Sequence, residues 1–193
     1  MYIAIEGIDT AGKSTQIVQL QKHFGNDCVV TKEPGGTEVG QKIRTMLLGG
    51  EVCSKRGEFL LFLADRAEHI EQVIMPNKDK TIICDRSAVS GVAYAMQSGN
   101  IKTDELVALN HFATSRHYPD VVFLLELTKE ELVNRLAQKE LDGIEKRGVE
   151  YLLEIQEHIK TAAKLLGIKL IVVDATKSIE KITKTIVEKL TLL

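Results

Sequence analysis

A glycine-rich stretch near the start of the chain has residue types that bind phosphate. Residues 7–14 read GIDTAGKS, which is the pattern G-x-x-x-x-G-K-S. In such a loop the glycines let several backbone N–H groups point at one anion, and the following helix adds its positive N-terminal end. Lys13 would reach the β- and γ-phosphates of a nucleoside triphosphate, and the Ser14 hydroxyl would ligate Mg²⁺. The residues that we expect to bind the triphosphate are Gly7, Ile8, Asp9, Thr10, Ala11, Gly12, Lys13, Ser14 and Thr15.

A second pair of charged residues follows a short apolar run. Asp85 and Arg86 come directly after Thr81–Cys84, which reads TIIC. An acid at the end of such a strand is placed like a Walker-B aspartate, which holds Mg²⁺ directly or through water. The planar guanidinium of Arg86 suits a phosphate group. The alternative interpretation is a structural ion pair between Asp85 and Arg86. We expect Ser14 and Asp85 to be the metal-binding residues.

A guanine-specific site is not indicated. The N-K-x-D motif of GTPases is approximated by Asn77-Lys78-Asp79-Lys80, but its fourth residue is Lys. The stretch also precedes the strand 81–84, whereas ligand-binding loops follow the carboxyl ends of strands in such sheets. We therefore interpret residues 77–80 as a polar turn.

The elements that must position these groups alternate along the chain. Helical patterns follow the phosphate loop, extend over 59–75 without Gly or Pro, and recur near the end of the chain, where Ser178 is the predicted N-cap. Alternating strands and helices predict an α/β fold with a parallel sheet. Nearly continuous apolar runs such as VVFLLEL are typical of strands covered on both faces. The predicted strands are Tyr2–Glu6, Cys28–Thr31, Thr81–Cys84, Val121–Leu127 and Lys169–Val173.

Composition limits the class of protein. The length of 193 residues fits one compact domain over residues 1–193. The 25 basic and 27 acidic residues give a net charge of −2, so a global basic field for nucleic acid is not expected. Neither a signal peptide nor a membrane span is predicted. The three widely spaced cysteines indicate neither zinc nor a disulfide framework, and they favour the reducing cytoplasm.

Several motifs taken together resemble one enzyme family. The stretches MYIAIEGIDTAGKST, TKEPGGT (31–37), LLFLADRAEH (60–69) and CDRS (84–87) are similar to those of thymidylate kinases. The resemblance runs through nearly the whole chain in order. It implies the P-loop NTPase fold, with a five-stranded parallel sheet flanked by helices and a short mobile lid. It also implies that ATP phosphorylates dTMP with Mg²⁺ as cofactor, and that the protein is a homodimer.

The resemblance implies where the acceptor phosphate lies. In the family the TKEPGGT loop lines the monophosphate site, so Lys32 and Pro34 are expected there, although relatives usually carry Arg at the position of Lys32. Lysine is a point charge and does not offer the two-pronged contact of arginine. Arg44 matches a further phosphate-facing arginine. Its alternative is a solvated surface charge. Arg86 is expected to contact the same phosphate group.

The base and sugar of dTMP are assigned by resemblance in the same way. Phe62 and Arg66 share a helix face at i, i+4. The matching family residues stack on thymine and hydrogen-bond its edge, while Ser90 and Tyr94 match positions near the base and sugar. The alternatives are a core role for Phe62 and Tyr94, and for Arg66 an ion pair with Asp65 or Glu68.

The phosphate loop itself raises two further expectations. In the family, an acid at the position of Asp9 accepts a hydrogen bond from the 3′-hydroxyl of dTMP. The alternative is that Asp9 only caps N–H groups of the loop. Some family members carry a catalytic arginine at the position of Thr10, and others supply it from a lid. Here the lid corresponds to residues 135–148, with Arg135 as the leading catalytic residue beside Lys13 and Arg86, and Arg147 as the second candidate for the lid arginine.

The loop DATKS (174–178) is expected beside the adenine, by resemblance. Gln156 and Ile159 stand where relatives commonly have Arg and Tyr, so acceptor contacts from that helix are not expected. Two other functions remain open at this point. One is a different nucleoside-monophosphate or deoxynucleoside kinase of the same architecture, and the other is a non-catalytic nucleotide switch.

Overall fold

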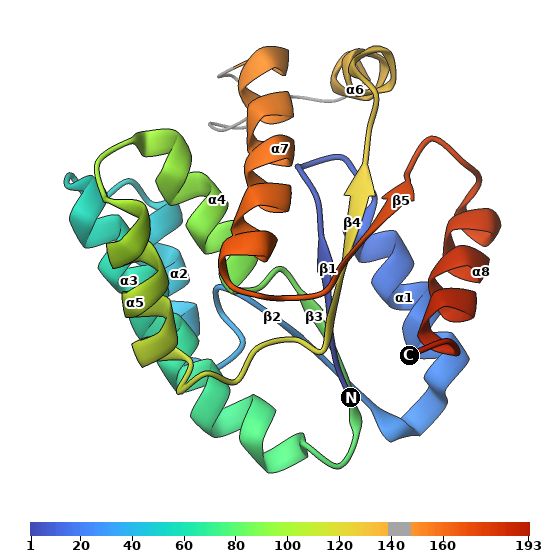
Figure 1. Ribbon diagram of the computed structural model, residues 1–193, viewed down its shortest axis with the longest axis horizontal. Helices are drawn as coiled ribbons and strands as arrows, with labels where there is room; N and C mark the ends of the chain where they lie inside the picture. The colour runs from blue at the N-terminus through green and yellow to red at the C-terminus, as the bar shows by residue number, and fades with distance from the viewer. Residues whose placement is uncertain (139–147) are drawn as a thin grey trace.

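The computed structural model describes residues 1–138 and 148–193, and Figure 1 shows its course. Within these residues, five parallel strands form one sheet in the order β2-β3-β1-β4-β5. The strands are β1 (Tyr2–Glu6), β2 (Cys28–Lys32), β3 (Thr81–Asp85), β4 (Val121–Glu126) and β5 (Leu170–Asp174). The helices are α1 (Lys13–Phe24), α2 (Glu38–Leu48), α3 (Lys55–His69), α4 (Ala88–Ser98), α5 (Thr103–Ala113), α6 (Lys129–Leu136), α7 (Val149–Leu165) and α8 (Ile179–Leu190), with short turns η1 (Gly25–Asp27), η2 (Ile70–Ile74) and η3 (Met75–Asn77).

The helices cover the sheet on both faces. Helices α1 and α8 lie side by side on one face, whereas α4 and α7 cover the other (Figure 1). Helices α2, α3 and α5 lie beyond α4, on the side of the sheet where β2 forms the edge. The centre of the core is aliphatic, and Ile3, Ile5 and Leu124 on the inner strands are fully buried. This arrangement confirms the predicted α/β fold with a parallel sheet.

The predicted strands are confirmed, and their ends differ by a residue or so from the prediction. Strand β3 extends to Asp85, so the acid that was expected after the strand is its last residue. Strand β5 differs more in character. Its apolar sequence LIVVD predicted cover on both faces, but the strand lies at the sheet edge and Val172 is 44% exposed. An edge strand has one neighbour instead of two, and its side chains are therefore less enclosed.

The helix predicted over 59–75 begins earlier and changes pitch. Helix α3 starts at Lys55 because the Ser54 side chain accepts a hydrogen bond from the Gly57 N–H and caps it. The chain stays helical to Asn77, but Ile70–Ile74 form a π-helical turn and Met75–Asn77 a 3₁₀ turn. The N-cap predicted for α8 is confirmed, since Ser178 accepts from the Lys181 N–H.

The sheet places the charged motifs at one edge. In the parallel register Ile5 pairs with Asp85, and Lys32 also pairs with Asp85. The carboxyl ends of β1, β2 and β3 therefore meet, and the chain leaves each of them into a polar loop. None of the helices within residues 1–138 and 148–193 combines the length and apolar character that crossing a membrane requires.

Candidate active site

The loop between β1 and α1 turns where two glycines take backbone conformations that other residues avoid. Gly7 has φ 153° and Gly12, at the N-cap of α1, has φ 94°. A Cβ on Gly7 would also lie 3.0 Å from the Leu125 carbonyl oxygen, so a side chain has no room there. Thr10 adopts φ 69° within the same loop, an uncommon conformation for a β-branched residue. The loop therefore curls back onto the start of α1, as the motif predicted.

Lys13 lies inside this curl. Its ammonium donates hydrogen bonds to the carbonyl oxygens of Gly7 and Ile8, both at 3.1 Å, and lies 3.7 Å from an Asp9 oxygen. Burial and the nearby positive charge of Arg86 lower the pKa of Lys13 to about 8, against the raising effect of Asp9. The structure thus provides a desolvated cation at the phosphate loop, held by backbone carbonyls.

A cavity of about 430 Å³ lies along this loop and reaches the ends of β2 and β3. The exposed Ser14 and Thr15 at the start of α1 line one wall of the cavity. Asp85 lines it from β3, and its Oδ1 atom is buried with no hydrogen-bond partner among the described residues. A hydroxyl and a carboxylate on one cavity are oxygen donors that suit a hard cation such as Mg²⁺. The predicted metal residues Ser14 and Asp85 therefore fit the ion by chemistry.

Arg86 joins the phosphate loop to the end of β3. Its guanidinium donates to the Gly7 carbonyl at 3.2 Å, to the Ser90 hydroxyl at 3.0 Å and to Asp9 Oδ1 at 2.6 Å. The ion-pair partner of Arg86 is therefore Asp9, and the alternative of a local pair with Asp85 is wrong. Asp9 in turn lies beside Arg86 and Lys13, so its carboxylate is stabilised by two cations in the cavity wall.

Glu6, which the sequence did not single out, hydrogen-bonds the residues that follow Arg86. It is fully buried at the end of β1 and accepts hydrogen bonds from the Ser87 hydroxyl at 2.8 Å, the Ser90 N–H at 3.2 Å and the Ser90 hydroxyl. Burial raises the pKa of Glu6, against the lowering effect of Arg86. The Ser87 hydroxyl also caps α4 by accepting from the Val89 N–H. Ser90, expected beside the nucleotide, contacts Glu6 and Arg86.

Two further predicted cations come from β2 and α2. Lys32, at the exposed end of β2, and Arg44, from α2, both line the cavity. Arg44 donates to the Pro34 carbonyl at 3.0 Å, and its side chain covers Gly35, where a Cβ would meet Arg44 Cδ at 3.0 Å. Arg44 therefore belongs to the site wall, and the alternative of a solvated surface charge is wrong.

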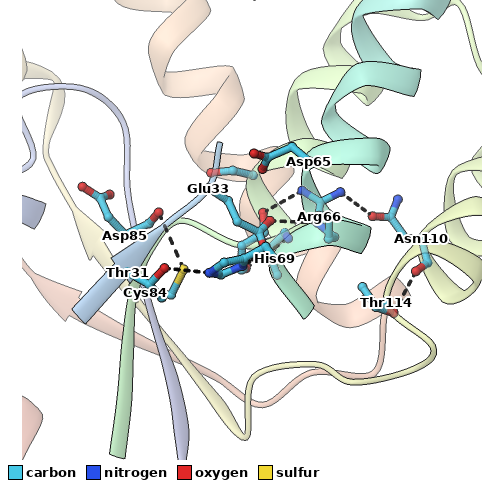
Figure 2. Close-up of polar contacts among 12 residues, drawn as sticks. Thr31, Glu33, Asp65, Arg66, His69, Cys84, Asp85, Asn110 and Thr114 are labelled. Carbon is cyan, nitrogen blue, oxygen red and sulfur yellow. Dashed lines mark hydrogen bonds and ion pairs between the residues drawn. The ribbon is translucent and has the colours of Figure 1, made fainter. Parts of the chain in front are cut away.

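Arg66 is the largest of the fully buried side chains, 2% exposed. Its ion-pair partner is Glu33, at 2.8 Å, so the expected alternative pairing with Asp65 or Glu68 is wrong (Figure 2). Phe62, one turn earlier on the same face of α3, is half-buried and lies outside the buried core to which Phe59 and Leu63 belong. A core role for Phe62 is therefore wrong as well.

Tyr94 has the core contacts considered as the alternative for it, and it also contacts Arg86. The ring packs against the core and lies 5.7 Å from the Arg86 guanidinium carbon, within the range of a cation–π contact. Burial raises the pKa of Tyr94 to about 12. Its hydroxyl is buried and has no partner among the described residues. The side chain thus connects the core of α4 to the edge of the site.

Comparisons with known proteins agree with this geometry. The family model described as "Thymidylate kinase" matches residues 5–186. A thymidylate kinase from Sulfurimonas denitrificans is 60% identical over 98% of this chain and 99% of that protein. One from Sulfurovum sp. is 54% identical over 96% of this chain and 97% of that protein. A crystal structure of thymidylate kinase from Ehrlichia chaffeensis superposes with a TM-score of 0.77 at 26% identity, covering 99% of this chain and 98% of that one.

The chain belongs to the thymidylate kinase family. The P-loop NTPase fold expected from the resemblance is confirmed with it.

Of residues 135–148, predicted to form the lid, the structure describes 135–138 and 148. Arg135, at the end of α6, donates to Glu131 at 2.6 Å, to the Thr10 carbonyl at 3.0 Å and to the Ala175 carbonyl at 2.7 Å. It therefore touches the phosphate loop and the DATKS loop, 174–178, that follows β5. The other predicted lid arginine, Arg147, lies outside the described residues.

Helix α7 places both Gln156 and Ile159 in buried positions. The Gln156 amide is buried, accepts from the Leu127 N–H at 2.9 Å and donates to the Leu127 carbonyl at 3.0 Å. Ile159 is fully buried in the core. Gln156 thus joins α7 to the residue that follows β4, while Ile159 packs in the core.

Sequence reasoning missed Glu33, Asn110 and Thr31 as well as Glu6. Glu33 lies within the TKEPGGT stretch, and a charged residue at a strand end was a signal that could have identified it. Asn110 had no such signal, because it lies within a helix far along the chain and meets Arg66 only in the folded protein.

Proposed function

We infer that the protein transfers the γ-phosphoryl group of ATP to dTMP, giving ADP and dTDP. The observation that carries this inference is one cavity lined both by the phosphate loop and by the cations Lys32, Arg44 and Arg86. A triphosphate held by the loop and a monophosphate held by these cations would place donor and acceptor phosphates next to each other. Membership of the thymidylate kinase family identifies the two nucleotides.

The reaction needs positioning and charge stabilisation more than it needs a base. The phosphate oxygen of dTMP attacks the γ-phosphorus in line with the leaving ADP oxygen, and charge spreads over the transferring group. We propose that Lys13, Arg86 and Arg135 stabilise that charge. Lys13 and Arg86 are already anchored on the carbonyl of Gly7, so they are held in place before the substrates bind.

We propose that Mg²⁺ binds with ATP, held by the Ser14 hydroxyl and by Asp85 directly or through water. The ion would neutralise charge on the β- and γ-phosphates. The observations in favour are that Asp85 and Ser14 line the same cavity and that Asp85 Oδ1 is buried with no hydrogen-bond partner among the described residues. Residues 7–15 would bind the triphosphate through the backbone N–H groups of the curled loop.

For dTMP we propose three groups of contacts. Lys32, Arg44 and Arg86 bind the phosphate, with Pro34 shaping the loop. Asp9 accepts from the 3′-hydroxyl of the sugar, and the packed ring of Tyr94 lies beneath it. Phe62 stacks on the base while Arg66 contacts its edge. Ser90 acts through Arg86, to whose guanidinium its hydroxyl is bonded at 3.0 Å.

The remaining assignments are proposals of the same kind. One cluster of buried apolar side chains includes residues from β1 to α8, which supports one domain over residues 1–193. We propose that the protein is a homodimer in the cytoplasm, as the resemblance implied, with ATP and dTMP as its partners and with neither nucleic acid nor a membrane among them.

A coupled ADP-release assay tests the function. The wild-type protein is supplied with ATP, Mg²⁺ and one acceptor at a time from dTMP, dUMP, UMP, CMP, AMP and dGMP. We expect the largest kcat/KM with dTMP. The 5-methyl contact that distinguishes dTMP from dUMP is worth about 1 kcal/mol or slightly more. Faster turnover with AMP or CMP than with dTMP would refute the proposal, and nucleotide binding without any acceptor-dependent turnover would favour a switch.

A further inference from the structure

A carboxylate that the reaction does not use lies beneath the acceptor side of the cavity. Glu33 follows β2, and its side chain is 3% exposed. One oxygen, Oε2, accepts from Arg66 Nε at 2.8 Å, and the other, Oε1, accepts from His69 Nδ1 at 2.9 Å (Figure 2). Burial disfavours the charged form, but Arg66 and His69 outweigh it and lower the pKa of Glu33. The residue is therefore a buried anion held between two side chains of α3.

The imidazole behind Glu33 is fixed from the other side. His69 is fully buried, and its Nε2 lies 2.7 Å from the Thr31 hydroxyl on β2. The Glu33 carboxylate can only accept from Nδ1, while the hydroxyl of Thr31 can either donate to Nε2 or accept from it, so the ring is held on both sides. A chain of contacts thus runs from Thr31 through His69 and Glu33 to Arg66. It links helix α3 to β2, the strand that ends at Lys32.

The contacts of Arg66 leave part of its guanidinium available. A guanidinium has five N–H donors. Nε bonds Glu33, one terminal nitrogen bonds Asn110 Oδ1 at 2.9 Å, and the other lies 3.4 Å from the Ser87 carbonyl. Each terminal nitrogen therefore retains one N–H without a described partner. A Cβ on Gly91 would lie 2.8 Å from NH2, so the guanidinium occupies space that a side chain at position 91 would take.

We propose that Glu33 is a positioning residue for base recognition. By holding Nε, it sets the plane of the Arg66 guanidinium so that the two remaining N–H groups face the carbonyl edge of the base that stacks on Phe62. His69 and Thr31 keep the Glu33 carboxylate from rotating. This proposal rests on the proposed function. It explains the orientation of the Arg66 terminal N–H groups by the contact between Glu33 and Nε.

The test compares two ligands that differ at the base edge. Binding of dTMP and of 5-methyl-dCMP, in which an amino group replaces the C4 carbonyl, is measured by calorimetry for the wild type and for Glu33→Gln. A site built to donate to a carbonyl should favour dTMP roughly 100-fold or more in the wild type. In Glu33→Gln we expect this preference to fall roughly tenfold, while ATP affinity changes less than about twofold.

Asp65→Asn is the matched control. Asp65 is a second buried carboxylate beside Arg66 on α3, but it accepts from the Gly35 N–H at 2.8 Å. The same carboxylate-to-amide change should leave the dTMP preference within about twofold of the wild type. A milder variant, Thr31→Val, removes the bond to His69 and retains the shape, and it should lower the preference about threefold.

Each outcome bears on the proposal. If Glu33→Gln weakens both ligands equally, or neither, Glu33 has only a structural role and the proposal is wrong. If Glu33→Gln does not fold, as judged by thermal melting, the ratio for Thr31→Val decides, and an unchanged ratio overturns the proposal. A wild type that does not phosphorylate dTMP would refute the proposed function, and that assay is separate from the variant ratios.

Discussion

The proposed donor and acceptor sides of the site are built in different ways. On the donor side, the loop 7–12 and Lys13 come from one uninterrupted stretch, and Lys13 is held by backbone carbonyls within it. On the acceptor side, Arg66 is held by Glu33 after β2, Asn110 on α5 and the carbonyl of Ser87 before α4. One side is therefore local in sequence, and the other exists only when distant elements have docked.

The two sides also treat buried charge differently. Each has a fully or nearly fully buried glutamate, Glu6 under the phosphate loop and Glu33 under the acceptor loop. Glu6 is held by hydroxyl and backbone donors, and burial raises its pKa. Glu33 is held by a guanidinium and an imidazole, and its pKa is lowered although burial opposes this. Neutral hydrogen-bond donors around a buried glutamate allow it to be protonated. Cationic partners instead stabilise its ionised form.

Lys13→Ala should produce the largest effect and break the donor side alone. Removing the ammonium deletes the charge that stabilises the transferring phosphoryl group, so kcat should fall on the order of 10³-fold. Steady-state kinetics with a fixed excess of dTMP measure this. Lys32→Ala is the acceptor-side counterpart, and it should raise KM for dTMP far more than it lowers kcat. A kcat of Lys13→Ala within tenfold of the wild type would contradict the assignment.

Arg135→Ala tests whether the donor side depends on a residue outside its own stretch. We expect kcat to fall on the order of 10²-fold or more, with little change in nucleotide affinity, because the arginine acts on the charge of the transition state. Lys129→Ala, an exposed cation on the same helix that pairs with Glu150, is the control and should have no such effect. An unchanged kcat in Arg135→Ala would move the role to Arg147 or elsewhere.

Asp9→Ala tests the contact point between the two sides. The carboxylate touches Arg86 and lies near Lys13, and it is proposed to accept from the sugar hydroxyl of dTMP. Its loss should raise KM for dTMP roughly tenfold and KM for ATP much less. Asp9→Asn keeps an acceptor oxygen and should be milder. Equal increases in both KM values would show that Asp9 only supports the loop.

The pH dependence of stability should have opposite signs for the two buried glutamates. The folded-state pKa of Glu33 is lowered from 4.5, so its contribution is present above that value and is lost as the pH falls through the lowered pKa. The pKa of Glu6 is raised from 4.5, so its contribution is present below that value and is lost as the pH rises through the raised pKa.

Urea unfolding of Glu6→Gln, Glu33→Gln and the wild type at several pH values measures this difference. The advantage of the wild type over Glu33→Gln should shrink as the pH falls below 4.5, whereas its advantage over Glu6→Gln should shrink as the pH rises. Each slope is limited to about 1.4 kcal/mol per pH unit. If the wild-type advantage over both variants changed with pH in the same direction, the contrast between Glu6 and Glu33 would be contradicted.

The smallest effect concerns the protonation of Lys13. Because its pKa lies at about 8 in the free protein, the ammonium loses its charge as the pH rises above that value. ATP affinity should therefore weaken roughly three- to tenfold between pH 7 and 9.5. Affinity for dTMP, measured by the same calorimetry, should change less over this range. A flat ATP affinity would mean that Lys13 remains charged.

The fold was predictable because its signals are local. Apolar runs and the helical patterns between them located the strands to within a residue or so, and Ser178 caps α8 as predicted because its side chain accepts from a backbone N–H at the helix start. The start of α3 at Lys55, capped by Ser54, was not predicted. The π-helical turn after α3 and the exposed face of β5 were not predictable. Both depend on which neighbours an element finds in the folded protein.

The amino-acid sequence alone determined the order of strands and helices, the phosphate loop, and, through its motifs, the two nucleotides to be joined. Tertiary structure decided the partners of the charged side chains: Arg86 with Asp9, Arg66 with Glu33, and Arg135 with the carbonyls of Thr10 and Ala175. The physical reason is that a loop motif closes its hydrogen bonds within a few residues. A buried ion must instead find its counter-charge across the fold, and spacing along the chain does not encode that distance.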